Sequence, residues 1–467
     1  MNAAVPSPES RAPEATSEAK IHPLSFAQKL FQSYYAGLPD PRVQHIYSAF
    51  QLSGPLAIDT FIAAIDALAR RHPILLAAYV AGPRGATGMR IDTLRRVPVE
   101  VIDLSGLDRT EAERRGRELA NASVLERFDL WNGPLMRARL LRLSADEHVL
   151  VFVFHHSIFD GQSLMIAIRD LGVLYTSIAN GRPCPLEATA CCTGYTEQLL
   201  HWVTTQDGRR HIEYWKERFE GACSPYWLPA DDELDGAPSA PSSAPRGGAG
   251  GATFEQLREL ARRSQASMFV VAAAGLAVVL RHWSARDDVF CCVLHSGRSQ
   301  LRYAASIGFF AECWVLRVDL SGAPSFREVL SRVRAAYIEG MPHVQAPYWT
   351  VKDDLARAGE EQPLLDIVLS HVPLARSPMA RSMGLGDDLS MAPSDWLELH
   401  NDIDTASGIK LFVATMEMPD SLSWFMLGSQ ARFRSSTVER CSAALSQVFE
   451  IAAVDPERSI TSYPLPL

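Results

Sequence analysis

The run of residues 149–154 is the feature that most constrains how this chain can fold. It reads V-L-V-F-V-F, six consecutive apolar residues with no polar position. A strand with one wet face would alternate, so this run predicts a strand buried on both faces. Its β-branched and aromatic residues favour strand over helix. Two histidines, His155 and His156, follow directly, and Asp160-Gly161 come shortly after them.

The residues after this strand predict a turn and then an amphipathic helix that begins at Ser163. An imidazole at the end of a rigid strand, facing a helix N-terminus, suits proton transfer and charge stabilisation. Considered alone, two histidines in apolar surroundings are more often structural than catalytic. Both interpretations stay open on this evidence.

Length and composition predict a folded, two-lobed protein. The chain has 467 residues, more than one ordinary domain, and 47% of them are hydrophobic. Helices alternate with strands in both halves, which favours two α/β sandwich lobes. We expect a disordered tail over 1–20, an N-terminal lobe over 21–180 and a C-terminal lobe over 181–467. A segment rich in Pro, Ala and Gly at about 229–251 is typical of a loop.

Charge and cysteine usage exclude several classes. The net charge of −9 and the absence of a Lys/Arg cluster argue against nucleic-acid binding. The sequence contains no run of 18 apolar residues, so we expect no membrane span, and its N-terminus has no signal-peptide pattern. The eight cysteines show no C-x-x-C spacing, so neither a metal site nor a disulfide framework is expected. Together these features predict a cytoplasmic protein with reduced thiols.

The string H-H-x-x-x-D-G at 155–161, followed by Q-S-L-M-I-A-I-R-D-L-G, resembles the core motif of condensation domains of nonribosomal peptide synthetases. These domains belong to an acyltransferase superfamily that includes chloramphenicol acetyltransferase. Weaker matches flank the core motif: S-x-A-Q at 25–28, R-H-P-I-L-L at 71–76 and I-G-F-F at 307–310. The resemblance extends from about residue 22 to the C-terminus.

The chain departs from the family pattern at three positions. Pro73 stands where the family usually has Glu, Leu76 where it has Arg, and Glu312 where Asn is common. The missing arginine matters because the family pairs its motif aspartate, here Asp160, with that residue. Three arginines could replace it, and the sequence does not decide among them: Arg137, Arg139 and Arg298.

The resemblance implies a fold and a set of roles. The fold would be two chloramphenicol acetyltransferase-like α/β sandwich lobes, arranged as a V-shaped pseudo-dimer around a tunnel. His156 would take the proton from an attacking nucleophile, or position it, and the Gly161 N–H would help to stabilise the oxyanion. His155 and Asp160 would be structural, with Asp160 anchoring the loop. No tightly bound cofactor is implied, since the acyl group arrives on the phosphopantetheine of a partner acyl or peptidyl carrier protein.

Because no G-G-x-S carrier segment occurs in the sequence, we expect a free-standing, monomeric condensation enzyme. It would transfer an acyl chain from a carrier thioester to a small-molecule amine or alcohol in nonribosomal peptide or polyketide biosynthesis, and release of a finished chain is one form of this reaction. Nothing separates an amine from a hydroxyl acceptor. Two alternatives remain: a soluble acyltransferase that uses acyl-coenzyme A, and a catalytically silent docking module.

Overall fold

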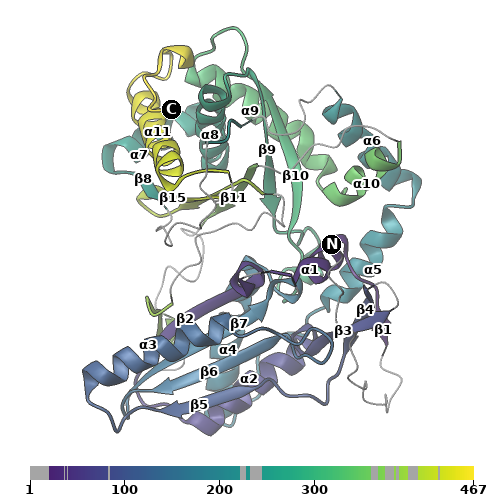
Figure 1. The fold of residues 1–467 in the computed structure, drawn as a ribbon, viewed down its shortest axis with the longest axis vertical. Helices are drawn as coiled ribbons and strands as arrows, with labels where there is room; N and C mark the ends of the chain where they lie inside the picture. The colour runs from purple at the N-terminus through teal and green to yellow at the C-terminus, as the bar shows by residue number, and fades with distance from the viewer. Residues whose placement is uncertain are drawn as a thin grey trace, which may run out of the picture.

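The computed structural model contains two six-stranded sheets, each with its own helices, one above the other in the view of Figure 1. It describes residues 20–467 apart from ten short gaps, and the predicted tail over 1–20 lies almost entirely outside the described residues. The gaps are 36, 39, 83–84, 221–227, 232–244, 359–366, 374–382, 385–388, 398–408 and 430–431.

The first sheet is built around the apolar run 149–154. Its strand order is β12-β13-β2-β7-β6-β5, so β7 (Glu147–His155) has a partner on each side. All six residues of 149–154 are at most 1% exposed, which confirms a strand buried on both faces. The other main strands and the helices of this part are β2 (His45–Ser53), β5 (Val99–Asp103), β6 (Met136–Arg142), α2 (Ile58–Arg71), α3 (Arg109–Leu125) and α4 (Gly161–Ala179).

The second sheet has the order β10-β9-β11-β14-β15-β8 and contains both parallel and antiparallel pairs. The apolar helix α8 (Met268–Ser284) packs against α9 and α11 and is buried along most of its length. The remaining elements of this part are β8 (Arg246–Gly250), β9 (Asp288–His295), β10 (Glu312–Asp319), β11 (Ile367–Val372), β14 (Leu411–Glu417), β15 (Ser421–Gly428), α7 (Gly251–Arg263), α9 (Phe326–Gly340) and α11 (Ser435–Val454).

Between the two sheets the chain runs through α5 (Cys192–Trp202) and α6 (Gln206–Phe219), at the side of the molecule in Figure 1. There α10 (Tyr348–Ala358) packs on α6 and also contacts α1 (Phe26–Tyr35). A small sheet, β1 (Ile21–His22), β4 (Gly85–Ile91) and β3 (Ala77–Gly82), lies beside α1.

A late segment of the chain returns to the first sheet. β13 (Ser390–Pro393) pairs antiparallel with β2, and β12 (Met383–Gly384) extends that edge. Just beyond it, Arg117 of α3 forms an ion pair of 3.1 Å with Asp395. Trp396 packs against Gly116, where an added Cβ would lie only 2.4 Å from the indole ring. These strands fall within 181–467, so the two sheets do not divide the chain at one point.

The α/β prediction is confirmed, but the predicted loop at 229–251 is wrong at its end. Residues Arg246–Gly250 form β8, which pairs with β15, and α7 begins at Gly251. This edge strand could not be predicted because its sequence lacks large apolar side chains. Gly247 and Gly248 place only backbone against Trp424 and Leu422. Most of the remaining loop prediction lies outside the described residues.

Among the described residues, no single helix combines the length and apolar character needed to cross a membrane, although α7 and α8 pass that test jointly as a pair bent by 106°.

We predict that Trp396→Ala destabilises the protein. The indole is 8% exposed and fills the space between α3 and the returning segment, so its loss leaves a cavity that should cost about 3–5 kcal/mol. Thermal unfolding measures the change. Trp131→Ala removes a Trp that is 40% exposed and serves as the control, with a much smaller expected effect. Equal melting temperatures for both variants would contradict this packing role.

Candidate active site

Strand β7 ends at His155 and delivers the two motif histidines into different surroundings. His155 is the last strand residue and is fully buried, while His156 begins a short 3-10 helix, His156–Ile158, and is partly exposed. The backbone changes from strand to 3-10 helix between the two residues, and their rings lie in different surroundings.

His155 lies in a buried aromatic and polar cluster. Its Nδ1 hydrogen-bonds the Ser157 hydroxyl at 2.7 Å, and its ring meets Tyr35 edge to face with centroids 4.6 Å apart. It is paired across the sheet with His45. Burial holds the pKa of His155 well below its usual value, and the neighbouring His45 and His156 add to that shift. A neutral, enclosed ring suits the structural role predicted for it.

The surroundings of His156 leave one of its nitrogens available. Its Nδ1 lies 2.7 Å from the carbonyl oxygen of Phe159. A carbonyl only accepts hydrogen bonds, so Nδ1 carries the proton and Nε2 of the neutral ring has a free lone pair. Phe31 stacks on the ring at 5.2 Å and Phe309 meets it edge to face at 5.3 Å. Burial lowers the pKa of His156, partly offset by the Phe159 carbonyl and by Asp160.

Asp160 is the N-cap of α4 and is occupied by hydrogen bonds. Its carboxylate accepts from the Ser163 N–H and hydroxyl, both at 2.8 Å, and from the Phe310 N–H at 3.1 Å. The cap makes α4 begin at Gly161, two residues before the predicted start at Ser163, because an N-cap precedes the first helical residue.

Arg298 pairs with Asp160. Its two terminal nitrogens lie 2.8 and 2.9 Å from the two carboxylate oxygens, and the side chains are 2% and 3% exposed. Of the other two candidate arginines, Arg137 donates to the Ser123 carbonyl and Arg139 pairs with Glu100. Arg298, from a different part of the chain, therefore supplies the positive charge that the family pattern would place at position 76.

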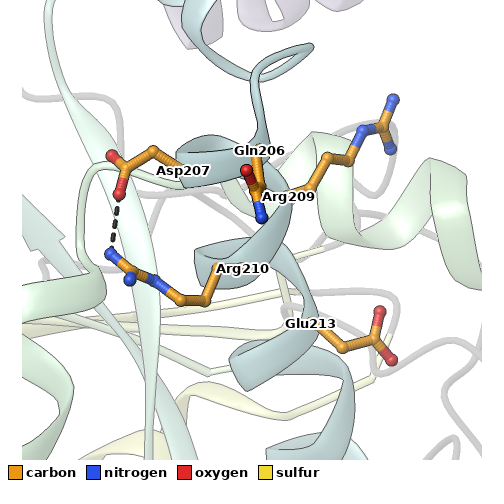
Figure 2. Close-up of a pocket in the computed structure, with 5 residues that line it drawn as sticks. All are labelled: Gln206, Asp207, Arg209, Arg210 and Glu213. Atoms are coloured by element: carbon orange, nitrogen blue, oxygen red, sulfur yellow. Dashed lines mark hydrogen bonds and ion pairs between the residues drawn. The ribbon is translucent and has the colours of Figure 1, made fainter.

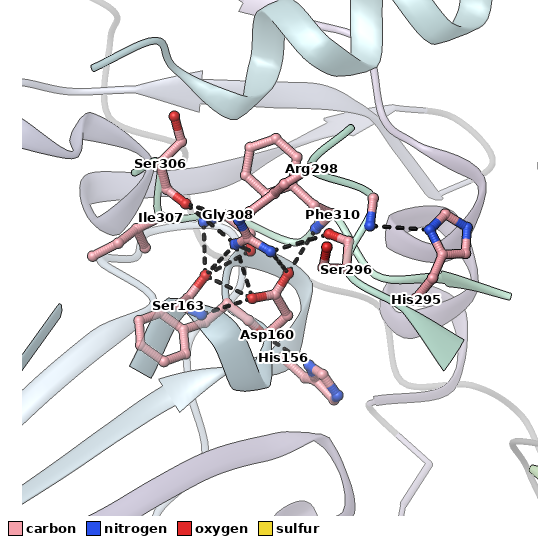
Figure 3. A network of polar contacts seen from close by, with 12 residues as sticks. His156, Asp160, Ser163, His295, Ser296, Arg298, Ser306, Ile307, Gly308 and Phe310 are labelled. Atoms are coloured by element: carbon pink, nitrogen blue, oxygen red, sulfur yellow. Dashed lines mark hydrogen bonds and ion pairs between the residues drawn. The ribbon is translucent and has the colours of Figure 1, made fainter. Parts of the chain in front are cut away.

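This ion pair holds a segment of the second half of the chain, residues 306–310, against α4 (Figure 3). Arg298 donates to the Ser306 carbonyl, and the Ser163 hydroxyl oxygen, whose proton goes to Asp160, accepts from the Gly308 N–H at 3.1 Å. In the same view the His156 ring points away from the network. Phe309 thus reaches His156 from a segment that the Asp160–Arg298 pair fixes in place.

A second buried charge cluster, which was not predicted from the sequence, supports the same segment. Asp170 of α4 is fully buried and accepts from Arg71 and His72, both at 2.8 Å. Nδ1 of His72 in turn accepts from the Ile307 N–H at 3.4 Å. The sequence shows Arg71 and His72 as part of a family motif, but it does not indicate that they pair with Asp170.

Gly161 is the first residue of α4 and follows His156 by five positions. As the first helical residue its N–H has no acceptor one turn earlier, and an added Cβ would meet no atom within 4 Å. Space for an approaching group and a free donor are both consistent with the predicted oxyanion role, which stays a prediction.

Two hollows of the structure lie away from the motif residues. One of about 690 Å³ runs along the charged face of α6, where Asp207 and Arg210 form an ion pair (Figure 2). Another of about 290 Å³ lies between α5 and the residues Gln300, Arg302 and Gln345. Neither is lined by His155, His156, Asp160 or Gly161, and the predicted tunnel stays a prediction.

Comparison with known proteins agrees with this geometry. The family model "Condensation domain" matches residues 18–467. The chain belongs to the condensation domain family. Two relatives, each 27% identical, are a linear gramicidin synthase of Brevibacillus parabrevis and phosphinothricin tripeptide synthetase PhsC of Streptomyces viridochromogenes. They cover 95% and 99% of the chain, which spans only 9% and 42% of their lengths.

Solved structures show the same fold. The X-domain from teicoplanin biosynthesis has a TM-score of 0.77 at 22% identity, over 97% of this chain and 99% of that one. The SgcC5 protein of Streptomyces globisporus has a TM-score of 0.74 at 25% identity, over 94% and 100%. The first condensation domain of the CDA synthetase gives 0.71 at 19%, over 96% and 99%. The chloramphenicol acetyltransferase-like α/β fold is thereby confirmed.

We predict that Asp160→Ala lowers the melting temperature strongly. The change leaves Arg298 buried without its partner, and breaking a buried pair in this way costs about 3–5 kcal/mol. Asp207→Ala is the matched control, because its pair with Arg210 is 53% and 73% exposed and such pairs contribute about 0–1 kcal/mol. If Asp160→Ala melts no lower than Asp207→Ala, the ion pair does not hold the site together.

Glu312 stands where the family commonly has Asn, and its burial predicts that the stability of the fold depends on pH. It begins β10 opposite His295, is 8% exposed, and burial raises its pKa to about 8. The folded protein then keeps a proton that the unfolded chain releases near pH 4.5, so stability falls as pH rises from about 4.5 to 8. Glu312→Gln should remove this loss, on the order of 3 kcal/mol at pH 7.

Melting temperatures at pH 5 and pH 8 test this statement. Glu312→Gln should melt higher than the wild type at pH 8 and close to it at pH 5. A gap that is equal at both pH values would show that the carboxyl is ionised in the folded protein.

Proposed function

We propose that this chain transfers an acyl group from a carrier-protein phosphopantetheine thioester to an amine or hydroxyl, with His156 as the proton acceptor. The observation that carries the proposal is the fixed tautomer of His156, whose Nδ1–H is held by the Phe159 carbonyl while Nε2 keeps its lone pair. Membership of the condensation family, whose sequence relatives here include peptide synthetases, supports the choice of reaction.

In the proposed reaction the acceptor N–H or O–H approaches Nε2 of His156. As the acceptor attacks the thioester carbon, Nε2 takes its proton and the carbonyl oxygen gains negative charge beside the Gly161 N–H. Collapse of this adduct breaks the carbon–sulfur bond, and the proton passes from His156 to the departing thiolate. The product is an amide or an ester.

His156→Ala should reduce acyl transfer by about 10²–10⁴-fold, the usual cost of losing a general base. The fold should persist because the ring is partly exposed at a strand end. Turnover is measured with an acyl-loaded carrier protein, and circular dichroism checks the fold. His201→Ala, which removes an exposed ring on α5, should leave the rate unchanged. Near-wild-type turnover of His156→Ala would rule out the proposed base.

The pH dependence follows from the lowered pKa of His156. A general base acts when unprotonated, so kcat/KM should hold through pH 6.5 and fall only below it. A pH–rate profile with one acyl donor measures the acid limb. A midpoint above 6.5 would contradict the assignment.

The choice of donor separates this proposal from its main alternative. A solved structure with the same fold, at 16% identity, is a starter condensation domain in complex with C8-CoA. This complex is the reason to test an acyl-coenzyme A donor here. Carrier contacts away from the reacting atoms would add positioning energy that coenzyme A lacks. We therefore expect faster transfer from the carrier than from coenzyme A at equal concentration. Equal rates would favour the acyl-coenzyme A alternative, and no transfer from either donor would favour the docking module.

The same assay can compare amine and alcohol acceptors. The SgcC5 structure contains an aryl ethanediol, so hydroxyl acceptors belong in the assay beside amines. One donor with a matched amine and alcohol measures the preference directly.

A further inference from the structure

Helix α1 lies against the turn that carries the two motif histidines, and three of its residues contact three consecutive residues there. The helix packs on the short 3-10 helix His156–Ile158. The contacting residues are spaced by three and by four positions, which places them on one face of α1. In chain order they are Gln28, Phe31 and Tyr35, and they meet Ser157, His156 and His155 respectively.

The Gln28 side chain is held in one orientation by the start of its own helix. Its Oε1 accepts from the Ser25 N–H at 2.9 Å, and the Ser25 hydroxyl accepts from the Gln28 N–H at 3.2 Å, which is the reciprocal arrangement of a capping box. Because an N–H only donates, the amide oxygen faces Ser25 and the amide nitrogen points the other way. There Nε2 donates to the Ser157 carbonyl at 3.0 Å, and Gln28 is 4% exposed. The cap of α1 thus also holds the turn.

Tyr35 fixes the other end of this helix face. Its hydroxyl donates to Nε2 of His45 at 2.8 Å and accepts from the Phe128 N–H at 2.7 Å. Nδ1 of His45 lies 2.8 Å from the Val124 carbonyl, so Nδ1 carries the proton and Nε2 is the acceptor. Tyr35 is 3% exposed, and its ring meets His155 edge to face. Hydrogen bonds of defined direction therefore hold both ends of the face.

Phe31 lies between these two ends and covers the His156 ring. The two rings are stacked, with centroids 5.2 Å apart and planes 20° apart. Phe31 and the Gln28 hydrogen bond both act on the geometry that lets Nδ1 of His156 reach the Phe159 carbonyl, because that bond forms across the turn that α1 holds. A histidine in water prefers the tautomer with its proton on Nε2. A loosened turn would therefore move the proton to the nitrogen that the proposed reaction needs free.

We propose that α1 is a positioning element of the acyl transfer, in which Gln28 holds the turn and Phe31 holds the ring of His156 so that Nε2 stays free of its proton. Both residues act through His156 and not on the substrate. The inference rests on the proposed role of His156 as the base. It gives the S-x-A-Q sequence at 25–28 a second task beyond the start of a helix.

The first test measures the tautomer of His156 without turnover. In protein labelled with nitrogen-15 histidine, NMR at pH 8 distinguishes a protonated from an unprotonated ring nitrogen, and His156→Ala identifies the signals of this ring. The wild type should show a protonated Nδ1. Gln28→Met and Phe31→Leu should move the proton toward Nε2, whereas Phe31→Tyr keeps the ring and should resemble the wild type. A protonated Nε2 in the wild type, or a wild-type pattern in Gln28→Met and Phe31→Leu, would overturn the proposal.

The second test separates positioning from stabilisation of α1. Ser25→Ala removes the hydroxyl half of the capping box and keeps the backbone N–H that orients Gln28. It should lower the melting temperature and leave kcat and the His156 signals unchanged. With an acyl-loaded carrier protein, Gln28→Met and Phe31→Leu should lower kcat by about ten- to hundred-fold and change KM little, because a displaced base slows the chemical step. Phe31→Tyr should restore kcat.

Two outcomes of the kinetic test are distinct. Equal kcat values for Ser25→Ala and Gln28→Met would show that α1 only stabilises the fold, which contradicts the positioning role. Near-wild-type turnover of His156→Ala would instead remove the base itself, and with it the use of α1 in the reaction. The NMR measurement would still show whether α1 sets the tautomer, so the two failures can be told apart.

Discussion

The ion pair between Asp160 and Arg298 is the interaction on which the site depends. It joins the first residue beyond the buried strand's turn to a side chain of the second half of the chain, with both charges almost wholly out of water. Such a pair is stable only when its remaining hydrogen-bonding atoms are satisfied. Here Ser163 and the Phe310 N–H satisfy the carboxylate, and the Ser306 carbonyl accepts from the guanidinium.

The same atoms explain why His156 and Asp160 have different tasks although they lie four residues apart. Asp160 uses its lone pairs on the helix cap, the arginine and the segment 306–310, so it has none left to orient the imidazole. His156 is oriented instead by the Phe159 carbonyl, within its own turn. Positioning of the ring and attachment of the two halves are thus done by separate hydrogen bonds.

Much of this arrangement could be predicted from the sequence because it is local. Six apolar residues in a row predict a doubly buried strand, and the motif after it predicts the place of His156. The partner of Asp160 could not be chosen, since Arg298 lies 138 residues away and three arginines matched the requirement equally. β8 was missed for a similar reason. Its glycines carry no side-chain pattern, and only pairing with β15 makes them a strand.

Contacts between residues far apart in the chain were also the part of the fold least predictable from the sequence. The return of β13 to the first sheet and the packing of Trp396 on Gly116 depend on residues more than 250 positions apart, and no periodicity indicates them. Asp170 is a buried polar position within the helix predicted after the motif, and the sequence does not indicate its partners. Its partners Arg71 and His72 come from α2 and its C-cap, and α2 packs against α4 only in the folded chain.

The most direct measurement of the central claim is amide hydrogen exchange in the wild type and in Arg298→Met. If the ion pair fixes residues 306–310, the N–H groups of Gly308 and Phe310, which donate to Ser163 and Asp160, should exchange faster in the variant. The amides of β7 should keep their protection, because the strand is held by β2 and β6 on either side. Unchanged exchange at 306–310, or an equal rise throughout β7, would contradict this role of the ion pair.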